Sequence, residues 1–277
     1  MLALLKQGEE VISIDPSWPA YREFVDFAGG KIKILQTTIE ERWTPNLRKL
    51  EEMIGQHTKV IILNYPNNPT GAVLPEGLFE RAVEFGREHD VLIVHDASYT
   101  ETTYDGYVAP SFLETPGAKD VGVEVFSLSK GWNMTGWRTA AIVGNADAVS
   151  TYWKLKTNID SGQFEAVQLA TVRALEDGPP AEMPALYQRR RDLVCDALRE
   201  IGVDVTPPKG TIYVWAPVPD GHTSASYCEL VLEESGVVVS PGGAYGPNGE
   251  GFFRISLTID DARLSEAVER LRGSLGG

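Results

Sequence analysis

Residues 59–71 read "KVIILNYPNNPTG", a continuous β-branched apolar run that ends in a turn rich in asparagine and proline. A short run of this kind, apolar on both sides, is typical of a strand buried in a parallel sheet. Similar runs recur at 10–14, 31–35, 91–96, 123–129 and 139–144, and helical patterns such as 74–89 lie between several of them. This order predicts an α/β fold with a mainly parallel sheet flanked by helices.

The pattern changes from about Ala146 to consecutive helices, with a "DGPP" breaker at 177–180. After the breaker we expect short strands and helices in alternation: helices at 185–202, 227–235 and from Asp260, and strands at 211–218, 237–241 and 251–259. This mixture predicts a smaller α+β domain after the large one. We place the boundary near Gly178, so that the predicted domains are 1–178 and 179–277.

The chain has 277 residues and a net charge of -14. Such an acidic surface argues against nucleic acid or an anionic membrane as a partner, because no basic face can neutralise phosphates. No apolar run approaches membrane-spanning length, and the start "MLALLKQGEE" turns acidic too soon for a signal peptide. We therefore expect a cytoplasmic protein, and we predict no metal centre.

Two smaller features concern cysteine and arginine. Cys195 and Cys228 lie in helical patterns among aliphatic residues, which favours buried thiols over a disulfide. The run from Arg189 to Arg191 is flanked by acids, and we expect it on a solvated helix face. Neither feature points to chemistry.

Residues just after each strand are the candidates for a site, because ligands of such sheets bind at the carboxyl ends of the strands. The turn at 64–71 offers asparagine amides there, although taken alone it is better explained as structural. Asp96 follows an apolar run with no basic neighbour in sequence, and a buried carboxylate needs donors or a cation. A ligand with a protonated ring nitrogen could be that partner. Alternation sends His95 to the opposite face, where we expect a packed histidine.

Residues 125–138, "VFSLSKGWNMTGWR", place one lysine after the next strand. Taken alone, Lys130 is best explained as an exposed loop residue. Its neighbours favour another interpretation, since the hydroxyls of Ser127 and Ser129 and the guanidinium of Arg138 suit a phosphate. A partly buried lysine beside them could form an imine. Phosphate donors, an imine-forming amine and a buried acid together indicate pyridoxal 5′-phosphate.

At this point the sequence resembles the fold-type I pyridoxal-phosphate enzymes, specifically the class I and II aminotransferases. The strings "NYPNNPTG", "HDASY", "SLSKGWNMTGWR" and "FFRISL" occur in the family's order, and the resemblance runs from about residue 8 to the C-terminus. It implies a ping-pong transamination between an L-amino acid and a 2-oxo acid, and a homodimer whose active sites borrow residues across the interface.

The resemblance also implies roles for individual residues. Lys130 would hold the cofactor as an imine and act as the base that moves a proton, and Asp96 would pair with the ring nitrogen. Asn68 and Tyr99 would hydrogen-bond the ring's phenolic oxygen. The remaining implied contacts are phosphate binding by Ser127, Ser129 and Arg138, ring stacking by Trp18, where a core role is an alternative, and substrate carboxylate binding by Arg254.

Within the family, the strings at 156–168, 209–224 and 245–257 are most similar to the bacterial LL-diaminopimelate aminotransferases of lysine biosynthesis. Asn158 in the first string is a candidate substrate contact, with a helix-end cap as an equal alternative. Other readings stay open: an aminotransferase for alanine, aspartate or aromatic amino acids, a C–S lyase or decarboxylase on the same fold, a non-catalytic regulatory module, or an inactive truncated fragment.

Family members carry a leading segment before the region that matches Met1. It supplies a glycine- and serine-containing phosphate-binding turn and a tyrosine given across the dimer interface. We therefore expect the large domain to be truncated at its N-terminus, with weaker cofactor retention and an exposed apolar surface.

Overall fold

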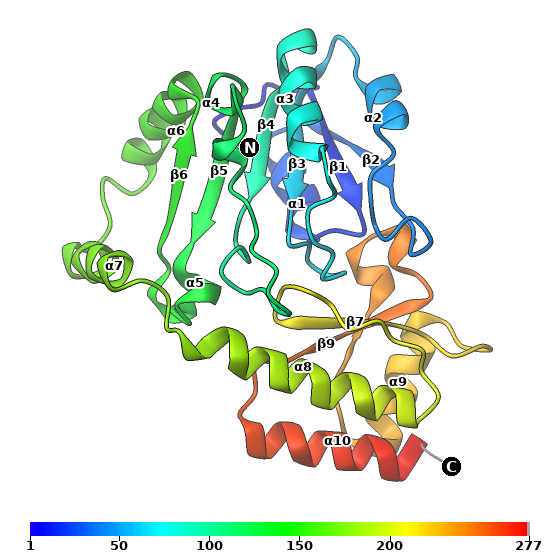
Figure 1. Cartoon of the computed structure of the whole chain (residues 1–277). Coiled ribbons are helices and arrows are strands. Elements are labelled where there is room, and N and C mark those ends of the chain that lie inside the picture. Colours follow the sequence, from blue (N-terminus) through cyan, green and yellow to red (C-terminus); the bar gives the residue numbers. More distant parts are fainter. Residues whose placement is uncertain (276–277) are drawn as a thin grey trace.

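The first part of the computed structural model, which describes residues 1–275, is a six-stranded sheet in the order β2-β1-β3-β4-β5-β6 (Figure 1). Five strands are parallel and β6 is antiparallel to β5. The strands are β1 Glu10–Asp15, β2 Lys31–Gln36, β3 Thr58–Asn64, β4 Leu92–Asp96, β5 Gly122–Ser127 and β6 Ala140–Gly144. The predicted α/β fold with a mainly parallel sheet is confirmed.

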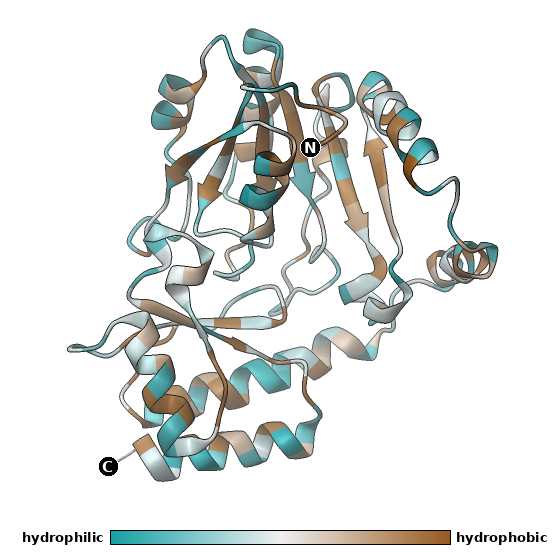
Figure 2. Ribbon diagram, turned by 180° about the vertical axis from the view of Figure 1, so that it is seen from behind, coloured by the Kyte–Doolittle hydropathy of each residue, from teal (hydrophilic) through white to brown (hydrophobic). Residues whose placement is uncertain are grey.

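Helices cover both faces of this sheet, and side-chain alternation decides which residues face which helix. Ile12, Ile61 and Ile93 share a core with α3 (Leu78–His89), together with α2 (Leu47–Met53) and α4 (Ala118–Val121). The intervening residues, such as Val60 and Val94, pack with α1 (Ala20–Phe27) and α6 (Ala146–Ile159) on the other face. Figure 2 shows the hydrophobic colour concentrated in these strands.

The face that carries α1 and α6 is hollowed between them. A cavity of about 540 Å³ lies there and is lined mostly by apolar side chains, among them Phe24, Val123 and Trp153. The next helix, α7 (Glu165–Asp177), buries none of its residues and exposes Leu169 and Val172. This side of the molecule therefore presents a large apolar surface.

The second part of the chain forms a three-stranded antiparallel sheet in the order β7-β9-β8, with helices packed together below it in Figure 1. Cys195 and Cys228 are buried and free, as predicted, and burial raises the pKa of their thiols to about 12 and about 11. The strand expected at 237–241 is reduced to two residues. The elements are α8 Glu182–Glu200, β7 Tyr213–Pro217, α9 Ser224–Ser235, β8 Ser240–Pro241, β9 Phe252–Ser256 and α10 Asp261–Leu275.

Asn248 joins the two parts near the end of β1. Its backbone N–H donates to Asp15 Oδ2 at 2.8 Å, and its side-chain amide donates to the Thr37 carbonyl at 3.1 Å. Gly246 sits against the same carboxylate with φ +122°, and a Cβ there would lie 1.5 Å from Asp15 Oδ1. Only glycine fits this approach.

Arg191 corrects the expectation of a solvated arginine run. The residue is only 3% exposed, and its guanidinium donates to both carboxylate oxygens of Asp105 at 2.6 and 3.1 Å. It also donates to the Pro208 carbonyl at 2.9 Å. Arg189 remains exposed. Arg191 differs from Arg189 because it binds Asp105, which lies 86 positions away along the chain, and no local sequence pattern reveals such a partner.

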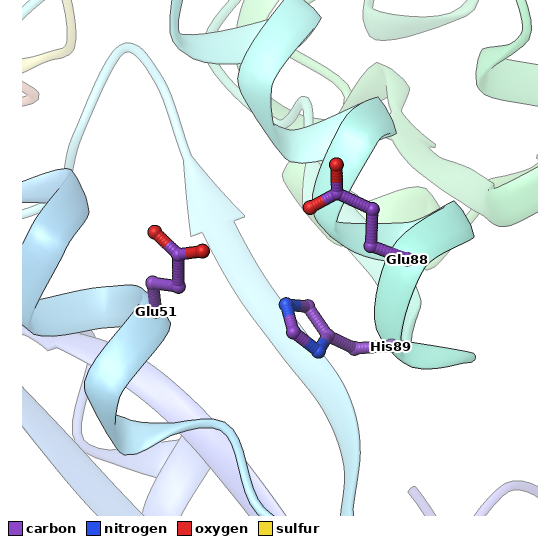
Figure 3. Close-up of side chains that lie close together, drawn as sticks. All are labelled: Glu51, Glu88 and His89. Carbon is purple, nitrogen blue, oxygen red and sulfur yellow. The ribbon is translucent and has the colours of Figure 1, made fainter.

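Glu51, Glu88 and His89 form the one group of potential metal ligands among residues 1–275 (Figure 3). All three are exposed, and Arg81 lies 3.4 Å from Glu51 and 3.9 Å from Glu88. The arginine supplies positive charge there, so we assign no metal to this group. In the same described part of the chain, no helix is long and apolar enough to cross a membrane.

Replacing the buried arginine should destabilise the fold. We expect Arg191→Ala to lower the free energy of unfolding by about 2 kcal/mol, because the buried Pro208 carbonyl loses its donor, whereas Asp105, whose side chain is 41% exposed, can be solvated by water. Chemical denaturation at neutral pH measures this. Arg189→Ala, on the same helix, is the matched control and should change stability by less than about 0.5 kcal/mol.

The loss of stability in Arg191→Ala should depend on pH. The hydrogen bond from Arg191 lowers the pKa of Asp105 below its ordinary value of 3.8. A carboxyl whose pKa is lowered by folding stabilises the fold above its ordinary pKa and loses that contribution as the pH falls through the lowered value. The gap between wild type and Arg191→Ala should narrow below pH 3.8. A gap that stays constant down to acid unfolding would contradict this account.

Candidate active site

A cavity of about 630 Å³ lies at the carboxyl ends of β3, β4 and β5, where it is closed on one side by β7 and β9. The structure brings together in its wall nine of the ten residues singled out from the sequence. They are Trp18, Asn68, Asp96, Tyr99, Ser127, Ser129, Lys130, Arg138 and Arg254.

The asparagine turn after β3 is both structural and part of the cavity. Asn64 Nδ2 donates to the Asp96 carbonyl at 2.9 Å, and Asn64 Oδ1 accepts the Asn68 N–H at 2.9 Å. Asn67 Oδ1 closes the turn by accepting from the Thr70 N–H and hydroxyl at 3.2 and 2.7 Å. Asn64 and Asn67 therefore build the turn, and Asn64 and Asn68 line the cavity.

Asp96 is the acid at the end of β4. Its Oδ2 accepts from the Tyr21 hydroxyl at 2.5 Å, and its Oδ1 accepts from the Ser98 N–H and hydroxyl at 3.0 and 2.5 Å. Burial, together with the nearby Asp96 charge, raises the pKa of Tyr21 well above its usual value, so the phenol keeps the proton that it donates. These donors hold the carboxylate in one orientation.

Sequence reasoning missed Tyr21. A signal was available, because Tyr21 follows Trp18 by three positions in "WPAY" and starts the helix after β1. Trp18 meets Tyr21 edge-on at 5.5 Å between ring centroids and remains 40% exposed at the cavity wall. A partly exposed aromatic ring in the cavity wall suits a stacking role.

Lys130 stands on α5 (Leu128–Gly131), a single turn directly after β5. Ser127 Oγ accepts the Ser129 N–H at 3.2 Å, which leaves its own hydroxyl proton free to donate. The Thr135 hydroxyl donates to the Ser129 carbonyl at 2.8 Å, and Arg138 Nη1 donates to the Thr135 carbonyl at 2.8 Å. This folded loop holds two hydroxyls, the amine and a guanidinium on the same cavity.

Arg254 reaches the cavity from β9. Its guanidinium lies 3.8 Å from the Tyr213 ring centroid and 4.7 Å from that of Tyr245, and Nη1 donates to Asn68 Oδ1 at 2.9 Å. Within the described residues, the buried Nε has no partner. A guanidinium with an open donor in such a place suits a carboxylate ligand. Neither tyrosine was predicted, although Tyr213 lies in the predicted strand 211–218.

Tyr99 lies beside Tyr213 in the cavity wall, with the two hydroxyl oxygens 3.4 Å apart. Burial, with a smaller contribution from Tyr213, raises the pKa of Tyr99 well above its usual value. Its hydroxyl is therefore a donor at neutral pH.

Asn158 is the residue that the structure does not bring to the cavity. It is exposed on α6, where its amide donates to the Lys154 carbonyl at 2.7 Å. This contact spans one turn within α6, whose C-cap is Asp160, so Asn158 is not the cap residue either.

The donor set of the cavity fits pyridoxal phosphate. One carboxylate, Asp96, opposes three cationic side chains, those of Lys130, Arg138 and Arg254. Asp96 can accept from a protonated ring nitrogen, the serine hydroxyls and Arg138 can donate to a phosphate, and Tyr99 can donate to a phenolic oxygen. The excess of positive charge suits a ligand with several anionic groups.

Comparison with known proteins agrees with this chemistry. The family model for "Aminotransferase class I and II" matches residues 1–271. The LL-diaminopimelate aminotransferase of Moorella thermoacetica is 46% identical over 99% of this chain and 71% of that enzyme. The enzyme of the same name from Desulforudis audaxviator is 48% identical over 97% of this chain and 69% of that enzyme.

Solved structures show the same fold. Aspartate aminotransferase from Thermotoga maritima superposes with a TM-score of 0.92 at 29% identity, over 100% of this chain and 72% of that one. The aromatic aminotransferase of Pyrococcus horikoshii gives 0.91 at 33% identity, over 98% of this chain and 74% of that one. The chain therefore belongs to the class I and II aminotransferases, transaminases that use pyridoxal phosphate.

Proposed function

We propose that this chain transfers the amino group of LL-diaminopimelate to 2-oxoglutarate, at the cavity that holds Lys130, Asp96 and Arg254. The observation that carries the proposal is the convergence of these three side chains on one cavity from three separate elements, α5, β4 and β9. Relatives that are 42 to 48% identical over nearly the whole chain and are named LL-diaminopimelate aminotransferase support the substrate.

The roles proposed for the residues follow from their chemistry. Pyridoxal phosphate, when bound, supplies an electron sink that lets the Cα–H bond of an amino acid ionise. Lys130 holds the cofactor and moves the proton released at Cα. Asp96, fixed by Tyr21 and Ser98, accepts the N–H of the cofactor ring and keeps it protonated.

The other cavity residues bind and orient. Ser127, Ser129 and Arg138 hold the phosphate, Asn68 and Tyr99 donate to the phenolic oxygen, and Trp18 stacks on the ring. Arg254 grips the α-carboxylate of the substrate and thereby places its Cα–H beside Lys130. Asn158, exposed on α6, is left without a role in this scheme.

We further propose the division 1–178 and 179–277, a cytoplasmic location and a homodimer. Every strand of the six-stranded sheet precedes Gly178 and every strand of the other follows it, which supports the division. Two buried free thiols suit a reducing compartment.

A donor panel with 2-oxoglutarate tests the substrate. LL-diaminopimelate should give glutamate faster than alanine, aspartate or an aromatic amino acid does. A faster rate with one of those donors would replace the proposed substrate. Pyruvate and ammonia, or carbon dioxide, without glutamate would indicate a lyase or a decarboxylase.

Removal of the amine should abolish transfer. We expect Lys130→Ala to lower kcat by at least about 10²- to 10⁴-fold, the usual contribution of a positioned acid or base. Glutamate formation in single turnovers measures this. Lys119→Ala, an exposed lysine on α4, is the control that should keep wild-type rates. Amino-group transfer at the wild-type rate in Lys130→Ala would contradict the mechanism.

Binding of the substrate carboxylate should require the guanidinium of Arg254 and not only its positive charge. Arg254→Lys keeps the charge but loses the planar fork, so we expect KM to rise at least about tenfold for both the amino acid and the 2-oxo acid. Arg263→Lys, on α10, is the matched control. Unchanged KM values would remove Arg254 from the substrate site.

The dimer should be visible by sedimentation. Trp153, Phe164 and Leu169 are 62%, 76% and 62% exposed on α6, α7 and the segment between them, which is more apolar surface than a monomer usually leaves open. We expect twice the mass of 30.3 kDa. Trp153→Asp is the comparison variant. A wild-type chain that sediments as a monomer at micromolar concentration would contradict the homodimer.

A further inference from the structure

We propose that His95 is a positioning residue of this site: its buried ring, through contacts at both ring nitrogens, cross-links β4 to β5 and to the segment directly after β3 beneath the cavity. This inference rests on the proposed roles of Asp96 and Asn68. His95 itself does not line the cavity.

Both ring nitrogens of His95 face acceptors. Nδ1 lies 3.1 Å from Glu124 Oε2, and Nε2 lies 3.1 Å from the Tyr65 carbonyl oxygen. A neutral imidazole carries one N–H and could donate to only one of them. The carbonyl can only accept, so the second bond requires a proton either on the ring or on Glu124.

Glu124 is held in place by further donors. The carboxylate already accepts the Phe112 N–H at 2.8 Å and the Ser111 hydroxyl at 3.0 and 3.1 Å. Burial alone raises the pKa of Glu124, but the hydrogen bonds from His95, Phe112 and Ser111 bring it below its ordinary value. Ser111 and Phe112 therefore fix the Glu124 carboxylate on one side, and His95 Nδ1 contacts it on the other.

The three groups joined by this ring belong to the strands that carry the site. His95 directly precedes Asp96, and alternation points the two side chains to opposite faces of the sheet. Tyr65 follows Asn64 at the start of the turn that ends in Asn68. Glu124 lies on β5, three positions before Ser127. The His95 ring therefore fixes the spacing of β4, β5 and the turn after β3 on the sheet face opposite to Asp96. On the cavity side, the Asn64 side chain links the same turn to Asp96.

The rest of the ring's environment is apolar. His95 is 0% exposed, with Phe79 at 4.9 Å and Phe112 at 6.5 Å between ring centroids. A buried ion pair in such a place often adds little net stability over an apolar pair of similar volume. Its directional bonds, however, set the positions of their partners, which apolar packing does not do.

Variants separate positioning from stability. We expect His95→Phe and Glu124→Gln each to weaken binding of pyridoxal phosphate at least tenfold, measured by titration of the full chain without cofactor. Phe85→Leu is the control, because Phe85 is fully buried on α3 away from the strand ends. It should lower the free energy of unfolding and leave the cofactor Kd within twofold.

A His95→Phe chain that binds the cofactor as tightly as Phe85→Leu would overturn the positioning role. His95→Gln covers the case in which the phenylalanine variant does not fold. Its amide can donate to only one of the two acceptors at full strength, so its Kd should fall between wild type and Glu124→Gln. A wild-type Kd in His95→Gln would also overturn the proposal.

Nitrogen NMR of the wild-type chain tests the contact with Tyr65 without cofactor. Two-bond couplings should show hydrogen on Nε2 of His95, because the Tyr65 carbonyl that it faces can only accept, and a ring with hydrogen on Nδ1 alone would overturn the cross-link as drawn. If the wild-type chain does not bind pyridoxal phosphate, the proposed function fails and the positioning role fails with it, whereas the NMR result still decides whether His95 binds Tyr65.

Discussion

The parallel register of β3, β4 and β5 places Asn64, Asp96 and Val125 in one row across the sheet. Each of these strands ends at the same edge of the sheet, and the segments that follow carry Asn68, Tyr99 and Lys130. Burial of the alternate residues on both faces holds the register, because a slip by one position would exchange the two faces and expose the core. The positions of the cavity residues thus depend on the packing of residues such as Ile61 and Ile93, which lie far from any ligand.

Polar groups at this edge of the sheet form hydrogen bonds with one another. The side chain of Asn64 binds the Asp96 backbone, Tyr21 and Ser98 bind the Asp96 carboxylate, and His95 binds Tyr65 and Glu124. A buried polar atom without a partner costs free energy, so a network of this kind has few alternative arrangements. Among the described residues, three buried donors lack a partner, Asn67 Nδ2, Trp215 Nε1 and Arg254 Nε, and of these residues only Arg254 lines the cavity.

Much of this could be predicted from the sequence, because local rules decide it. Apolar runs that end in polar residues predicted the strands and the strand-end candidates Asp96, Ser127, Ser129, Lys130 and Arg138, since every parallel strand ends at the same edge. Trp18 and Arg254, which also line the cavity, came from the family resemblance. What failed depended on contacts between distant segments. The burial of Arg191 follows from Asp105, and the role of Tyr21 follows from the way α1 lies across β4, neither of which leaves a local pattern. Asn158 was chosen from a string match alone, and the position of α6 keeps it away from the cavity.

The aromatic rings on either side of Arg254 have a consequence for the thermodynamics of ligand binding. Tyr213, Tyr245 and the Asn68 amide hold the guanidinium in a single pose before any ligand is present. An arginine side chain carries about 2 kcal/mol of rotamer entropy, and this chain loses that entropy when it folds. A carboxylate that binds Arg254 would then meet a rigid, preorganised donor, and the ordering of this side chain would no longer oppose its association.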